Sequence, residues 1–230
     1  MKQNTRTDWF KRILLLAILL LLALPSLGVQ VQGGDCQACP VATAPIYLEA
    51  YVRDTATGET ARISVHRETA FIVEDGNGRH GWVTYCAEIP ARMLSRGSTT
   101  TSRTDPSISY RLTLTQYFSD FYDNNLWWVS VSRYRGTWQS LDPQVTGIDG
   151  WLMAGAMGPK WGGGWIYDVD ETHLTPGDSA TRTLYPSWAG IYVGVDNGYQ
   201  CGQIGVELRR VSGHTWEFWF NVCKGEIWPY

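Results

Sequence analysis

The sequence lacks the short motifs that mark the common enzyme and nucleotide-binding families. It contains no Gly-x-Ser-x-Gly elbow, no His-Glu-x-x-His zinc helix, no phosphate-binding loop and no EF-hand loop. It also has only one Cys-x-x-Cys, formed by Cys36 and Cys39, so a zinc site built from two such pairs cannot form. Pro40 occupies the position where a haem attachment motif requires histidine. These absences exclude the usual hydrolase, nucleotide and haem assignments.

No stretch has the apolar periodicity of a convincing amphipathic helix. Short runs rich in β-branched and aromatic residues alternate instead with turn residues, which is typical of an all-β domain. We predict a twisted antiparallel β-sandwich, concanavalin-like or similar, that contains a disulfide and occupies residues 44–230 as a single domain. The strands are expected at 47–53, 61–65, 69–74, 82–87, 109–121, 126–134, 145–154, 191–196, 200–210 and 214–223, with a helical turn at 90–94 and loops at 95–105 and 158–186.

The most informative stretch is the predicted hairpin formed by 200–210 and 214–223. Its apolar residues alternate with polar or small ones, as in half-buried strands. A fold about Ser212 places Leu208 opposite Trp216, and the same register places Cys201 opposite Cys223. We therefore predict a cross-strand disulfide between these two cysteines.

The other face of this hairpin carries Gln203, Glu207, Glu217, Trp219 and Asn221. The register sets Glu207 against Glu217, and two opposed carboxylates repel each other unless a cation or a shared proton relieves them. Arg209 and Arg210 are close in sequence, so we expect them to screen the pair. The alternative is a working carboxylate pair.

The chain begins with the layout of an export signal. Basic residues precede an apolar run at 13–24, and Ser26 and Gly28 offer the small side chains that a signal peptidase requires. We predict a signal peptide at 1–28, a disordered leader at 29–43 and a secreted or extracytoplasmic protein; an uncleaved anchor is the alternative.

The net charge of the chain limits the classes of binding partner to be expected. Loss of residues 1–28 leaves 15 basic and 21 acidic residues, a formal charge of −6. This argues against nucleic acid or anionic membrane as partner, and we expect a monomer. All five cysteines lie in the exported part, which fits an oxidising compartment, and a bond from Cys36 or Cys39 to Cys86 is the expected use of two more.

The glycine-rich part of the 158–186 loop suggests a binding role. Trp161 and Trp165 bracket three glycines, and an exposed tryptophan pair suits stacking on a sugar or clamping a peptide. Together with Trp219 and Asn221 they are our candidate ligand-binding residues. Trp161 is expected to be more exposed than Trp127 or Trp128, which fall in strands and should fill the core.

Three carboxylates in the same loop are of the type that calcium prefers. They belong to Asp168, Asp170 and Glu171, but their spacing fits no specific calcium motif. We expect no cofactor, and calcium at these three residues is the alternative.

Three segments resemble strands of the fungal and bacterial glutamic peptidases (eqolisins): Trp188-Ala-Gly-Ile-Tyr-Val-Gly-Val-Asp196, Gln203-Ile-Gly-Val-Glu207 and Thr215-Trp-Glu-Phe-Trp219. The resemblance implies a β-sandwich in which Gln203 stabilises the oxyanion of a peptide cleaved by a glutamate-activated water. That family places its glutamate downstream of the glutamine. Here the nearest match lies upstream, at Phe71-Ile-Val-Glu74, which requires a permuted strand order.

Two classes of function follow from these observations. The preferred hypothesis is an exported β-sandwich that binds an extracellular carbohydrate or peptide without chemistry. The alternative is a secreted acid hydrolase that uses Gln203 with Glu74, or the Glu207 and Glu217 pair. A purely structural protein of the cell envelope is the third hypothesis.

Overall fold

Twelve strands make up most of the computed structural model, which describes residues 46–94 and 108–225. One short 3-10 helix, η1 (Ala91–Leu94), follows the fourth strand and confirms the predicted helical turn. The strands are β1 (Ile46–Asp54), β2 (Thr60–Ile63), β3 (Val65–Asp75), β4 (Gly78–Pro90), β5 (Ile108–Asp123), β6 (Leu126–Ser140), β7 (Val145–Pro159), β8 (Trp165–Leu174), β9 (Ser179–Leu184), β10 (Val193–Gly194), β11 (Tyr199–Arg210) and β12 (Thr215–Gly225).

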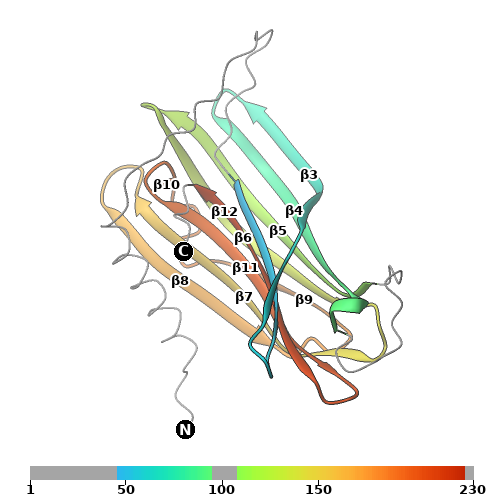
Figure 1. Cartoon of the computed structure of the whole chain (residues 1–230). Coiled ribbons are helices and arrows are strands. Elements are labelled where there is room, and N and C mark those ends of the chain that lie inside the picture. Colours follow the sequence, from blue (N-terminus) through green and yellow to red (C-terminus); the bar gives the residue numbers. More distant parts are fainter. Residues whose placement is uncertain (1–45, 95–107, 226–230) are drawn as a thin grey trace, which may run out of the picture. The chain divides into compact units, whose positions relative to one another are not determined.

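The strands form two antiparallel sheets that lie as separate layers (Figure 1). Sheet A has the strand order β2-β1-β12-β11-β7-β8, and sheet B has the order β10-β6-β5-β4-β3, with β9 also paired to β6. The predicted disulfide-containing antiparallel β-sandwich is therefore confirmed.

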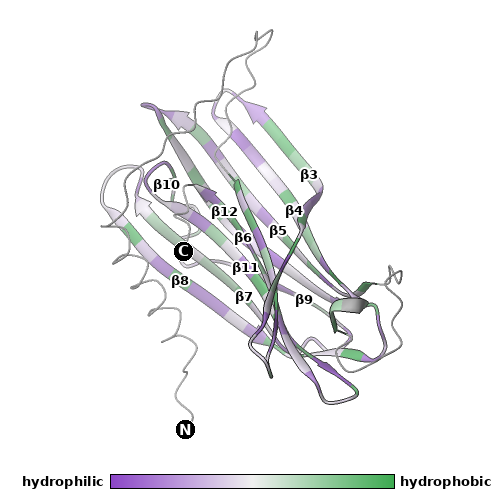
Figure 2. Ribbon diagram, viewed as in Figure 1, coloured by the Kyte–Doolittle hydropathy of each residue, from purple (hydrophilic) through white to green (hydrophobic). Residues whose placement is uncertain are grey.

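The core lies between the two sheets because apolar side chains alternate with polar ones along the strands (Figure 2). Trp138 of β6 is fully buried there, and its indole N–H donates to the carbonyl of Gly205 in β11, 2.8 Å away. The largest fully buried side chains are those of Trp138, Tyr85, Tyr110, Tyr134, Phe218, Phe220, Ile89, Leu94, Leu112, Leu114, Leu152 and Ile204.

The C-terminal hairpin has the register that the alternation predicts. Leu208 pairs with Trp216, and Cys201 pairs with Cys223 across β11 and β12. The disulfide between these two cysteines is formed. Sequence pattern alone therefore locates the buried and outer faces of this hairpin.

Two predictions about elements were wrong. The segment 158–186 is not a loop, because it contains β8 and β9, which pair with β7 and β6. Both strands lie at sheet margins, where polar residues are tolerated on both faces and the period-2 signal is lost. The strand expected at 191–196 is reduced to the two residues of β10, after which Val195 donates to the carbonyl of Trp127.

A buried charged cluster joins the sheets. Asp120 of β5 accepts two hydrogen bonds from Arg79 of β4, each 2.9 Å long, and one from the ammonium of Lys224 in β12, 3.1 Å away. Asp120 and Lys224 are buried, and the ammonium also lies 3.0 Å from the ring centroid of Phe118. One carboxylate thus balances two cations, and burial lowers the pKa of Lys224 to about 8, against the opposing attraction of Asp120.

Several predictions fall outside the described residues. They are the signal peptide at 1–28, the leader at 29–43 and the loop at 95–105. Within the described residues, no helix is long and apolar enough to span a membrane.

Candidate functional site

The outer face of sheet A brings together the polar residues of the C-terminal hairpin. Gln203 of β11 pairs with Asn221 of β12, and Gly205 pairs with Trp219. Strand order adds β1 beside β12 and β7 beside β11, so that Tyr51 lies next to Trp219 and Trp151 lies next to Gly205. The face is therefore built from four neighbouring strands.

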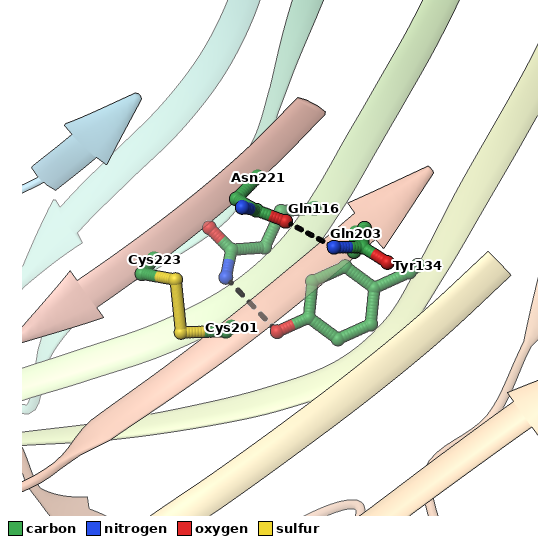
Figure 3. The surroundings of a disulfide bond; sticks show 6 residues. All are labelled: Gln116, Tyr134, Cys201, Gln203, Asn221 and Cys223. Carbon is green, nitrogen blue, oxygen red and sulfur yellow. Dashed lines mark hydrogen bonds between the residues drawn. A yellow bond between two sulfur atoms is a disulfide. The ribbon is translucent and has the colours of Figure 1, made fainter. Parts of the chain in front are cut away.

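A line of hydrogen bonds crosses three of these strands. The indole N–H of Trp151 donates to Oε1 of Gln203 at 3.0 Å, and Nε2 of Gln203 donates to Oδ1 of Asn221 at 2.7 Å (Figure 3). Both ends of the Gln203 amide are therefore bonded to neighbouring side chains. Because Asn221 uses its oxygen here, its amide nitrogen is left as a donor at the end of the line.

Trp151 is held in this position by a glycine. A Cβ on Gly205 would lie only 2.1 Å from Cζ2 of Trp151, so the indole occupies the space that any larger residue would fill. Trp151 is buried on the outer face of sheet A rather than between the sheets.

An aromatic pair lies beside the amide line. The rings of Tyr51 and Trp219 have centroids 5.8 Å apart, and both side chains are half-buried. Glu49, which pairs with Asn221 in the register, is exposed and lies 3.7 Å from Arg62. A ring surface, an amide donor and a carboxylate acceptor thus share one patch, which we call the Trp219 patch: Glu49, Tyr51, Trp219 and Asn221.

The disulfide covalently joins β11 and β12 on the same face. Figure 3 shows Cys201 and Cys223 on the two strands that also carry Gln203 and Asn221. The third pair in Figure 3, Gln116 and Tyr134, belongs to sheet B, where Nε2 of Gln116 donates to the Tyr134 hydroxyl at 3.3 Å.

Glu207 and Glu217 are direct neighbours, as predicted. Screening by Arg209 and Arg210 was predicted, and a further cation, Arg53 of β1, lies 2.5 Å from Glu217. Arg210 instead donates to Gln144 and to the carbonyl of Leu94. The sequence could not reveal Arg53, since its contact depends on β1 lying next to β12.

The structure does not bring Glu74 to Gln203. Glu74 lies exposed on β3, at the edge of sheet B, whereas Gln203 lies on the outer face of sheet A. The strand order therefore supplies no glutamate from the Phe71-Ile-Val-Glu74 segment to this face.

The three acidic residues considered for calcium do not converge. They lie on a strand, β8, so alternate side chains point to opposite faces. Asp168 and Asp170 accept hydrogen bonds from Ser187, while Glu171 contacts Nε2 of His173 at 2.7 Å. Among the described residues, no group of three or more metal-ligating side chains is close enough to hold an ion.

The predicted exposure of Trp161 is confirmed. Trp161 is 49% exposed and Trp165 is 59% exposed, whereas Trp127 and Trp128 are each 8% exposed. The two exposed tryptophans flank the turn from β7 to β8, in which all three glycines have positive φ. Trp161 also packs edge-on against Phe121 and Trp128, at centroid distances of 5.1 Å, so this turn is separate from the Trp219 patch.

The expected bond from Cys86 to Cys36 or Cys39 is not formed. Cys86 is a free, buried thiol, and burial raises its pKa to about 11; Cys36 and Cys39 lie outside the described residues. An unreactive thiol is the physical consequence, because the thiolate form is suppressed.

Sequence reasoning missed a second surface, on the outer face of sheet B. A depression of about 230 Å³ crosses its strands and is lined by Thr69, Trp82, Thr84, Thr115, Tyr117, Arg135 and Thr137. The sequence does show two threonines at alternate positions in β5. β-Branched residues are common in any strand, however, so these threonines do not indicate a site.

No protein-family model matches the chain, and no curated protein is significantly similar to it.

Proposed function

We propose that this protein is a non-catalytic binding protein of the extracellular space that holds a carbohydrate on the Trp219 patch. The observation that carries the proposal is the aromatic pair of Tyr51 and Trp219, which lies next to the cross-strand pair of Asn221 and Glu49 on the same face. The preferred carbohydrate is neutral, because the patch already contains a carboxylate.

Carbohydrate chemistry matches this set of groups. The C–H face of a sugar ring is apolar and stacks on an aromatic ring, while its hydroxyls both donate and accept hydrogen bonds. The amide nitrogen of Asn221 supplies a donor, and Glu49 supplies an acceptor. A site of few, well-placed polar groups around an aromatic surface is the usual composition of a small-ligand site.

The hydrogen bonds of Gln203 favour binding over peptide cleavage. An oxyanion donor must point at the open position where negative charge develops. The Gln203 amide is instead bonded to Trp151 and Asn221, so it positions the Asn221 donor. The glutamate that the peptidase hypothesis needs, Glu74, lies on the other sheet.

The extracellular setting is part of the proposal. Disulfides persist in oxidising compartments, and Cys201 is bonded to Cys223. The predicted export signal at 1–28 agrees with this location.

The test is a glycan array of neutral oligosaccharides probed with residues 29–230, followed by titration calorimetry with the best-bound oligosaccharide. Trp219→Ala should weaken binding by about 2 kcal/mol, or about thirtyfold in Kd, as expected for a central aromatic contact. Trp165→Ala is the matched control, since it removes an exposed tryptophan outside the patch.

Three results would contradict the proposal. They are the absence of any bound neutral glycan, equal effects of the two tryptophan variants, and cleavage of denatured protein between pH 3 and pH 8 that Gln203→Ala abolishes. The last result would establish the acid hydrolase instead.

A further inference from the structure

The depression on the outer face of sheet B is independent of the Trp219 patch, because it lies on the other sheet. Its shape follows from the register of four strands. Thr69, Thr84, Thr115 and Arg135 form one row across β3, β4, β5 and β6. Four strands at the usual spacing of about 4.8 Å give a row about 14 Å long, which suits an extended ligand of a few sugar rings.

Trp82 and Tyr117 form a wall of the depression and belong to a row of larger side chains. Phe71, Trp82, Tyr117 and Arg133 are neighbours in the register, directly beside the threonine row. Phe71 stacks on Trp82 at a centroid distance of 6.5 Å, and the guanidinium of Arg133 lies 3.9 Å from the ring centroid of Tyr117. These contacts hold both aromatic rings in place beside the small threonine side chains, and the difference in size produces the hollow.

The floor of the depression presents hydroxyl groups. The hydroxyls of Thr84 and Thr115 are hydrogen-bonded at 2.9 Å, and those of Thr137 and Thr181 at 3.3 Å. A hydroxyl has one donor and two acceptor positions, so each pair retains capacity for a ligand hydroxyl. Threonine and aromatic residues are both common in strands for reasons of propensity, but propensity does not explain the arginine at the end of the row.

The lining of the depression contains one charged side chain, the cation Arg135. Arg135 is exposed and has no carboxylate partner among the described residues, and no acidic side chain lines the depression. Arg111, on the same face, is neutralised by Glu88 at 2.5 Å. Glu68 adjoins Thr69 in β3 but does not line the hollow. The formal charge of the full chain is −3, so Arg133 and Arg135 make this a local cationic site.

We infer that this depression binds an acidic oligosaccharide, one that carries uronate carboxylates. The guanidinium of Arg135 pairs with a carboxylate, the threonine hydroxyls bond to ring hydroxyls, and the Trp82 and Tyr117 wall contacts the C–H face of a sugar. Arginine suits the carboxylate because its planar fork offers two parallel donors.

The experiment measures binding of three uronate oligosaccharides, from polygalacturonate, alginate and hyaluronan, and of the neutral methyl ester of the first. We expect at least one uronate to bind with a Kd below about 1 mM and its uncharged counterpart to bind at least about tenfold more weakly. Arg135→Gln should weaken uronate binding about 10- to 100-fold, the effect of losing a charge-assisted hydrogen bond.

Arg209→Gln is the matched control, because it removes one exposed arginine from sheet A. It should leave uronate binding unchanged, and so should Trp219→Ala, which separates this site from the proposed neutral-glycan site. Far-ultraviolet circular dichroism and thermal unfolding check that each variant folds.

The inference is overturned if none of the three uronates binds, or if the methyl ester binds as well as the acid. It is also overturned if Arg135→Gln and Arg209→Gln weaken binding equally, since that result would mean general charge attraction without a site.

Discussion

Gly205 shows how one residue without a side chain organises the outer face of sheet A. Its missing Cβ gives Trp151 the space to lie against β11, and Trp151 then orients the amide of Gln203. The Gln203 amide in turn fixes that of Asn221. The sequence predicts which of these residues share a face, but not this order of hydrogen bonds, which depends on β7 being the neighbour of β11.

At this scale we predict that Gly205→Ala destabilises the fold by about 1–3 kcal/mol, because the new methyl group overlaps the indole of Trp151. It should also weaken binding at the Trp219 patch. Gly155→Ala on β7 is the matched control, since its Cβ would lie an ordinary 3.8 Å from Tyr199. Urea unfolding of both variants is the measurement, and equal stability of the two would contradict the proposed role of Gly205.

The β11–β12 hairpin is the element that sequence pattern predicts best. Its alternating apolar residues, its turn and its two cysteines agree on one register. The strand β8 was not predicted, because its alternation is limited to the four residues 167–170 and the residues that follow are mostly polar on both faces. The position of β1 beside β12 could not be predicted either, since the two strands are at opposite ends of the chain and their pairing is non-local. Glu49 and Tyr51 were missed for that reason.

For this hairpin we predict that Cys201→Ser combined with Cys223→Ser lowers the free energy of unfolding by about 3 kcal/mol, the usual effect of opening a short cross-linked loop. The fold should survive, because the register is also fixed by packing of Val206 against Phe218 and Leu208 against Trp216. Cys86→Ser serves as the control that leaves the bridge intact. Loss of β-sheet circular dichroism in the double variant would contradict the account of the register.

In the whole molecule, the two sheets are joined by a buried carboxylate as well as by the apolar core. Asp120 balances Arg79 and Lys224, so Asp120→Asn leaves the buried ammonium of Lys224 and the partly buried guanidinium of Arg79 without a counter-charge and should cost about 3–5 kcal/mol. Lys224→Met leaves the bond between Arg79 and Asp120 intact and should change stability little, or raise it by about 1 kcal/mol. Denaturant unfolding compares the two variants, and an equal cost for both would show that the ammonium, not the balance of charge, stabilises the cluster.

The same cluster predicts a dependence of stability on pH. Burial lowers the pKa of Lys224 from 10.5 to about 8, so between these values the unfolded chain binds more protons than the folded protein. The contribution of Lys224 to the free energy of unfolding should therefore rise with pH across this window. Cys86 acts in the opposite direction above about pH 9, because burial raises its pKa to about 11.

The difference in unfolding free energy between wild type and Lys224→Met isolates the lysine, since Cys86 is common to both. We expect this difference to shift in favour of the wild type from about pH 8 to about pH 10. If this difference does not change with pH, the account in which burial lowers the pKa of Lys224 is contradicted.

The central claim is that the outer face of sheet A binds a carbohydrate. The most direct measurement is the change in backbone amide chemical shifts when a glycan is added. Labelled protein would be titrated with the neutral oligosaccharide that the array selects. We predict that the largest shifts occur at Glu49, Tyr51, Trp219 and Asn221. In Trp219→Ala, about thirtyfold more oligosaccharide should be needed to reach the same shifts at Glu49, Tyr51 and Asn221. Shifts confined to sheet B or to the turn from β7 to β8, or no shifts at saturating oligosaccharide, would contradict the account.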